Sequence, residues 1–245
     1  MPKRSHLIKI GVLTFIAGIT LLFPARVAYQ WFAPPGIQVS GIGGSVWVGH
    51  AREADASGIY LRDLKWRIRL RDLVTLKLGF AVSSSLASGF VEGEIAIGIS
   101  GSVVARNVSA SLQLSTLQYA TEIRGLQGNL FAQITVLELE AGIPVTVDGV
   151  LEVSDLIAPP IDQNSIGGYR AEFLTQESGI TASVEDTDGV IDLAGSLQIS
   201  RDRSYQFVAQ LSAKPETPPG VRQQMQFLGS ANERGQHELR VEGQL

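Results

Sequence analysis

Four cations alternate with apolar side chains in the segment 61–77, within a domain that is acidic overall. The cations are Lys65, Arg67, Arg69 and Arg71. Because successive side chains of a β-strand point to opposite faces, all four cations are expected to emerge on one face. Such a ladder suits docking to an acidic partner or to lipid headgroups. The alternative interpretation is an edge strand that its charges protect against aggregation.

A second group of candidate binding residues is acidic. It consists of Glu185, Asp186, Asp188 and Asp192. Clustered carboxylates are typical calcium ligands, but the twelve-residue EF-hand loop ends in a Glu that is absent here. Asp188-Gly189 is instead a typical hairpin turn, which leaves the other carboxylates on solvated strand faces. The sequence therefore predicts no metal site.

Residues for catalysis are not grouped in any known pattern. The chain has no cysteine, and its three histidines, His6, His50 and His237, lack the spacing of metal ligands. It contains no nucleophile elbow, no P-loop and no dinucleotide-binding glycine motif. We therefore predict no catalytic, cofactor-binding or metal-binding residues and expect a protein that is not an enzyme.

The charges are divided unevenly along the chain. The 24 acidic residues all follow the first 33 residues, and the net charge is −4. The basic residues before that point are Lys3, Arg4, Lys9 and Arg26. An acidic main domain is a poor partner for the phosphates of nucleic acid, so we exclude nucleic-acid binding.

The N-terminal segment has the pattern of a membrane anchor. Residues 10–23 are apolar or small throughout and follow the basic flank 1–9. They span about 21 Å as a helix, less than the ~30 Å hydrocarbon core. A cleaved signal peptide is one interpretation, but the small-residue cleavage motif is missing. We favour an uncleaved anchor at 10–33, completed by aromatic residues suited to the membrane interface. These are Tyr29, Trp31 and Phe32.

Beyond the anchor, apolar and polar residues alternate with a period of two. The clearest segments are 108–114, 144–154, 190–200 and 204–212. This period predicts antiparallel strands with one apolar and one wetted face. Turns are predicted at Ser88-Gly89, Asp148-Gly149, Gly167-Gly168 and Asp188-Gly189. One short helix is expected near 218–228, opened by Pro218 and Pro219.

The predicted organisation is therefore a cytoplasmic basic flank (1–9), a transmembrane anchor (10–33), a linker (34–43) and an exported β-rich domain (44–245). The fold class is mainly β, with a twisted antiparallel sheet or sheets of many short strands. Both a sandwich-like arrangement and a curved open sheet fit this pattern. In the sandwich, a second sheet would be the simplest cover for the apolar face of the first.

Several elements together resemble a known family. Residues 39–49 have the sequence V-S-G-I-G-G-S-V-W-V-G. Further elements follow in the same order: Leu64-Lys65-Trp66, Asp72-Leu73, Gly167-Gly168-Tyr169, Asp188-Gly189 and Phe227-Leu228-Gly229. The chain thus resembles the type II secretion system protein N family, also called general secretion pathway protein N, over nearly its whole length. The resemblance implies a single-pass inner-membrane protein of a Gram-negative bacterium, with a periplasmic domain and other secretion subunits as partners. It implies no catalytic residues and no cofactor.

Two functions remain open on the sequence alone. The first is a structural or assembly component of the secretion apparatus. The second is a periplasmic lipid-handling module, in which a curved sheet presents an apolar groove to acyl chains. An open groove lined by Trp47, Trp66 and aliphatic side chains would favour the second, and a closed dry core the first.

Overall fold

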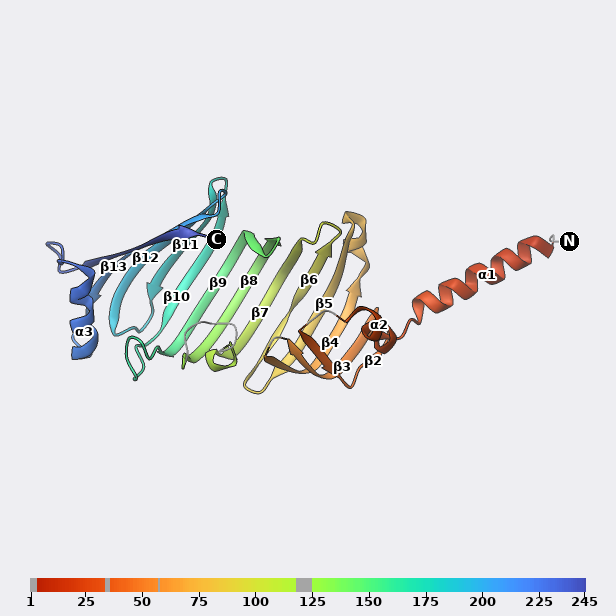
Figure 1. The fold of residues 1–245 in the computed structure, drawn as a ribbon, viewed down its shortest axis with the longest axis horizontal. Coiled ribbons are helices and arrows are strands. Elements are labelled where there is room, and N and C mark those ends of the chain that lie inside the picture. The colour runs from red at the N-terminus through yellow and green to blue at the C-terminus, as the bar shows by residue number, and fades with distance from the viewer. Residues whose placement is uncertain (1–3, 34–35, 57, 118–124) are drawn as a thin grey trace.

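The computed structural model describes residues 4–33, 36–56, 58–117 and 125–245. It contains a long sheet with helices at its ends (Figure 1). The helices are α1 (Arg4–Leu21), α2 (Ala25–Phe32) and α3 (Pro219–Met225), and the short 3-10 helices are η1 (Leu70–Thr75), η2 (Leu114–Leu117) and η3 (Gln226–Leu228). Lys3, predicted as part of the basic flank, lies outside the described residues.

The strands follow one another along the chain with short connections. They are β1 (Ile37–Ser40), β2 (Gly43–Gly44), β3 (Val48–Ala56), β4 (Ile59–Arg69), β5 (Lys77–Leu86), β6 (Gly89–Gly98), β7 (Val103–Gln113), β8 (Gln127–Glu140), β9 (Ile143–Ile157), β10 (Tyr169–Gln176), β11 (Gly179–Asp186), β12 (Ile191–Ser200), β13 (Ser204–Ala213) and β14 (His237–Gln244).

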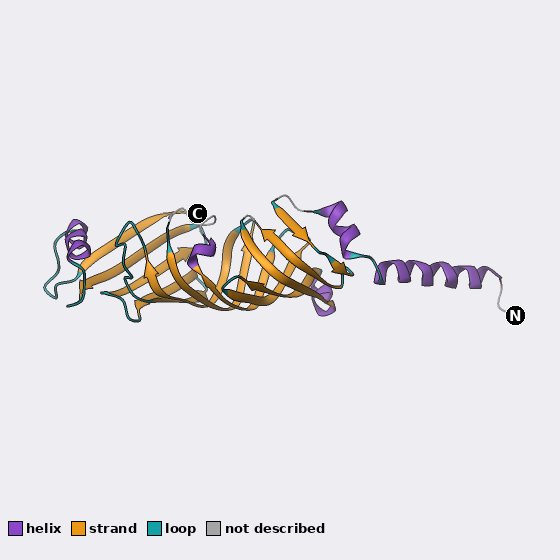
Figure 2. Cartoon of the chain, turned by 90° about the horizontal axis from the view of Figure 1, so that it is seen from below, coloured by secondary structure: helices purple, strands orange, loops and turns teal. Residues whose placement is uncertain are grey.

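All of these strands belong to one 14-stranded sheet, in the order β1-β3-β4 and then consecutively to β14, with β2 paired to β3. Each of these pairings is antiparallel, as the alternating pattern predicted. The mainly β, antiparallel fold class is thus confirmed. Of the two arrangements that the sequence left open, the described residues form the curved open sheet (Figure 2) and no second sheet.

Irregularities in the pairing bend this sheet. The register shifts between Arg62 and Lys65 in β4, between Glu92 and Glu94 in β6, and at three places in β8. Asp63 and Asn107, which lie at two of these shifts, have φ angles of 49° and 50°. A bulge adds one unpaired residue to a strand and increases its bend and twist, so these sites give the sheet its curvature.

One predicted turn is wrong. Asp148-Gly149 lies inside β9, not at a hairpin. There the register against β8 shifts, and Gly149 has φ 153° opposite Ile134. The carboxylate of Asp148 accepts a hydrogen bond from the backbone N–H of Thr175 at 2.6 Å. The Asp-Gly pair therefore forms part of a β-bulge. Bulges and turns favour the same residue types, which is why the sequence pattern suggested a turn. The other three predicted turns fall between strands.

The N-terminal segment forms two helices where one continuous helix was predicted. α1 ends at Leu21 and α2 begins after Pro24, which has the extended angles φ −67° and ψ 132°. Proline lacks a backbone N–H and disfavours helical geometry in the preceding residue, so the first helix cannot continue through it. Within the described residues, no helix combines the length and the apolar character needed to cross a membrane.

The end of α1 is fixed to the sheet through the turn between β2 and β3. The indole N–H of Trp47 donates to the carbonyl oxygen of Thr20 at 2.6 Å, and the N–H of Val46 donates to the carbonyl of Phe23 at 3.0 Å. The predicted linker 34–43 is largely structured: 34–35 lie outside the described residues, 37–40 form β1, and Gly43 begins β2. Chain pairing with β3 thus begins directly after α2.

The predicted helix near 218–228 is confirmed as α3 followed by η3, at the opposite end of the sheet from α1 (Figure 1). Pro219 occupies its first turn, where the missing N–H costs nothing. Val221 and Met225 are buried at a spacing of four residues, so this helix attaches to the sheet by one apolar face.

Candidate functional site

The register brings apolar side chains from successive strands into rows that cross the sheet. One row runs from β6 to β14 through Val91, Ala110, Ala132, Leu151, Ala171, Val184, Gly195, Ala209 and Leu239. The adjacent row of the same face runs through Val108, Ile134, Gly149, Phe173, Ala182, Leu197, Phe207 and Val241. These two rows contain no charged residue. We call them, with their extension through Trp66, Phe80 and Val82, the apolar face.

The apolar face is not covered by another layer of the described chain. Most of its large side chains remain partly exposed. The accessible surface of the chain is 15764 Å². A compact protein of 26.3 kDa would expose about 10,600 Å². Part of the excess belongs to α1, but an open sheet with no second layer accounts for much of the rest.

Aromatic rings on this face lie against glycines of the neighbouring strand. The ring of Trp66 lies over Gly49, so closely that any Cβ there would collide with it. A Cβ added to Gly195 would lie 3.1 Å from the ring of Phe207. The missing side chains let the rings lie along the sheet, which makes the apolar face smoother than its residue types alone would suggest.

Where α2 meets the apolar face, the two form an open apolar cavity of about 340 Å³. Its lining consists of Ala25, Ala28, Val46, Leu64, Trp66, Phe80, Val82 and Ile95. Trp66 points its polar N–H away to the carbonyls of Ser45 and Val46, at 3.3 and 3.2 Å. Trp47, which would line a groove with Trp66 in the lipid-handling alternative, instead binds the end of α1. This cavity was missed in the sequence because its walls come from elements far apart in the chain.

The basic ladder lies on the opposite, polar face, but only partly as predicted. β4 pairs with β3 on one side and β5 on the other, so the interpretation as an edge strand is wrong. Lys65 and Arg67 are exposed, and neither has an ion pair among the described residues. They line a polar hollow of about 730 Å³ with His50, Glu92 and Asn107. These two cations are therefore the part of the ladder that is available to a partner.

The other half of the ladder is structural. Arg69 forms ion pairs with Asp72, at 3.4 Å, and with Glu94, and its side chain is only 11% exposed. Arg71 lies in η1, not in the strand, and its guanidinium contacts Glu94 at 3.2 Å. This cluster holds η1 against the polar face, because Asp72 is buried over Gly79, where a side chain would collide with it.

The acidic group near 186 makes an internal ion pair. Lys214 Nζ donates to Asp186 Oδ2 at 2.5 Å and to the carbonyl of Gly189 at 2.9 Å. Burial disfavours the charged form of Asp186, but hydrogen bonds from Lys214 and from the N–H of Leu193 outweigh it and lower the pKa of Asp186 below 3.8. The sequence analysis did not predict this pair. A possible signal was that Lys214 is the only lysine after Lys77.

Comparison with known proteins gives one consistent family. The family model described as type II secretion system (T2SS), protein N matches residues 35–240. A type II secretion system protein N from Vibrio cholerae is 24% identical over 243 residues, covering 94% of this chain and 94% of the relative. One from Aeromonas hydrophila is 21% identical over 258 residues, covering 100% of both. No solved structure matches the chain significantly.

The Asp186–Lys214 pair predicts a defined response to acid. Because the folded-state pKa of Asp186 is lowered, the pair stabilises the fold at neutral pH, and this contribution is lost as the pH falls through the lowered pKa. Asp186→Asn should lower Tm at pH 7, and the difference from the unsubstituted protein should shrink below about pH 4. Thermal unfolding of the full chain at several pH values measures this.

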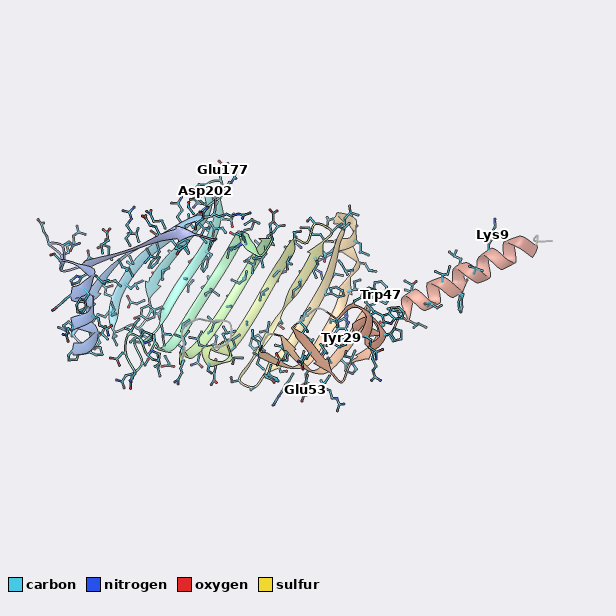
Figure 3. All side chains as sticks on the ribbon, in the orientation of Figure 1. Lys9, Tyr29, Trp47, Glu53, Glu177 and Asp202 are labelled. Carbon is cyan, nitrogen blue, oxygen red and sulfur yellow. The ribbon has the colours of Figure 1, made fainter. Side chains whose placement is uncertain are left out.

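Glu177→Gln is the matched control, because Glu177 lies in the exposed turn between β10 and β11 (Figure 3). It should leave both Tm and its pH dependence nearly unchanged. A Tm difference for Asp186→Asn that stays constant from pH 7 to pH 3 would contradict the assigned role of this pair.

Proposed function

Because the chain belongs to the type II secretion system protein N family, we propose that it is a non-enzymatic component of the type II secretion apparatus that assists export of folded proteins from the periplasm. The main support for this proposal is that the family model covers residues 35–240, which include nearly the whole sheet. The absence of a recognisable catalytic pattern in the sequence supports a role in assembly or scaffolding.

For its location, we propose that α1 holds the chain in the inner membrane, with the N-terminus in the cytoplasm and the sheet in the periplasm. The basic flank supports this orientation, since positive residues stay on the cytoplasmic side. α1 projects from the end of the sheet, and its large apolar side chains are mostly more than half exposed (Figure 1). From Ile10 to Leu21 this helix carries no charged side chain, and such a stretch suits lipid surroundings.

The junction after α1 has the features of a membrane interface. Phe23 and Trp31 are in contact with ring centroids 5.8 Å apart, and Phe32 lies 6.4 Å from Trp31. Trp31 and Phe32 are 67% and 75% exposed. In Figure 3, Trp47 marks this junction, and Lys9 lies near the far end of α1. Aromatic residues gather at the headgroup level of a bilayer, so the junction supports a position of α2 at the periplasmic surface.

Reporter fusions test this orientation. A reporter that is active only in the periplasm should be active when fused after Leu245, and a reporter that requires the cytoplasm should be silent there. The same reporters fused before Met1 serve as the control and should show the reverse pattern. Cytoplasmic activity at Leu245 would contradict the proposed location.

Loss of the chain tests the proposed function. Deletion in the bacterium that encodes it should leave proteins that normally leave by the type II route folded but retained in the periplasm. The measurement is the share of their enzymatic activity in the medium relative to the periplasmic fraction. Expression of the full-length chain should restore export. Unchanged secretion in the deletion strain would overturn the proposal.

Lys65 and Arg67 are our candidates for docking an acidic segment of another apparatus subunit. They stand next to each other on one strand face, they are exposed, and the surrounding domain is acidic, which makes this local positive surface distinctive. Complementary charge speeds association and selects partners more than it adds affinity. Arg69 and Arg71 are excluded from this role, since Glu94 already engages both.

The docking role predicts loss of export without loss of fold. Lys65→Gln combined with Arg67→Gln should cost no more than about 0.5 kcal/mol of unfolding free energy per substitution, since both residues are exposed. Export by the double variant should fall markedly. Arg201→Gln with Arg203→Gln, two exposed cations in the β12–β13 turn, is the matched control and should export normally. Normal export by the Lys65 and Arg67 variant would exclude docking at this site.

A further inference from the structure

The apolar face of the sheet extends far beyond what any element of the chain covers. At about 4.8 Å between strands, its rows cross the sheet over several tens of ångströms. α2 covers only the end near β4 to β6, where the 340 Å³ cavity lies. Across the part of the chain that the structure describes, no other element lies over this face.

We propose that the apolar face binds the acyl chains of membrane lipids, which enter through the cavity beside α2. This goes beyond the proposed role in secretion, and it uses only the membrane position of α1 from that proposal. The sheet would then carry lipid chains away from the membrane along its long axis.

The chemistry of the face favours an acyl chain over a polypeptide. Its two rows offer apolar contacts and no charged group. The interior strands are paired on both sides, so their backbone groups are already engaged in the sheet. An extended peptide laid on such a face would bury its own N–H and C=O groups without partners, which is costly. An acyl chain carries no polar group along its length and meets no such cost.

The shape of the face disfavours a second copy of the chain. Neighbouring strands rotate by roughly 20–25° relative to each other, and this rotation accumulates along the sheet. In packed sheets the strand directions stay within about 30° of each other, so a second copy would have to match this accumulated twist along the whole face. α2 also stands on the face near Trp66 and Phe80, where an opposing sheet about 10 Å away would have to lie. Flexible acyl chains follow a twisted surface without this restriction.

The position of the cavity favours lipid as the source of the apolar chain. Ala25 and Ala28 of α2 form one wall, and Phe23 directly before them carries the carbonyl that anchors Val46. The cavity thus opens within a few residues of the end of α1, whose exposed apolar surface we place in the membrane. In that setting the nearest abundant apolar ligand is an acyl chain. The cavity wall continues into the apolar face through Phe80, Val82 and Ile95.

Photocrosslinking of the full chain in intact membranes tests this inference. Leu151 lies on the apolar face in β9, and Leu174 in β10 lies on the opposite face with 54% exposure. Replacing either one with photo-leucine changes the side chain very little, so both proteins should fold. After irradiation, Leu151 should yield adducts with the mass of one membrane lipid, and Leu174 should yield few or none. Adducts at Leu151 with a second copy or another protein, equal labelling at both positions, or no lipid adduct would overturn the proposal.

A charge placed on the face provides a second test. Ala132→Asp introduces a carboxylate beside Leu151, and it should reduce the lipid adduct at Leu151 by about tenfold or more because burying a charge against an acyl chain is unfavourable. Gln133→Asp, the neighbouring residue on the exposed face, should leave the adduct unchanged. If Ala132→Asp fails to fold, the comparison of Leu151 with Leu174 still decides. If deletion of the chain blocks export but Leu151 yields no lipid adduct, the proposed role in secretion stands and only the lipid inference is overturned.

Discussion

The antiparallel register that runs from β3 to β14 is the constraint on which the rest of this structure depends. Because each strand is paired with its sequence neighbour, a single shift by one residue would move every apolar side chain of that strand to the wetted face. At Asp63 and Asn107 one strand carries an extra residue that has no partner on the neighbouring strand. The pairing resumes after this residue, so the apolar side chains that follow return to the apolar face. Register thus determines both the continuous apolar face and the curvature of the sheet.

A one-layer sheet has an unusual balance of stability. Its interior strands are paired on both sides, but most of its large apolar side chains keep part of their surface exposed to water, and hydrophobic burial is the dominant favourable term in folding. The ends are secured by different means: Trp47 and Val46 bind the end of α1, and Lys214 joins Asp186 to the segment before α3. An acyl layer on the apolar face would complete the burial that the chain leaves unfinished.

The two faces of the sheet suit two kinds of partner. The polar face carries Lys65 and Arg67 beside a hollow, where a charged protein segment can be recognised. The other face provides apolar contact near the proposed membrane position. Since alternate residues of the same strands form the two faces, a protein contact and a lipid contact can exist at the same time. A secretion component in the inner membrane would in this way contact both its apparatus and its bilayer.

The antiparallel β class, most turns and the helix at 219–228 could be predicted from the residues alone, because they follow from local periodicity and residue type. The family resemblance was also visible there. The choice of one open sheet over a sandwich became clear from the three-dimensional structure, since alternation specifies one apolar face but not what covers it. Tertiary contacts likewise decided that Asp148-Gly149 lies in a bulge, that Arg69 is engaged with Glu94, and that Lys214 reaches Asp186. Each of these depends on a residue distant in sequence or on the register of a neighbouring strand, which no local pattern encodes.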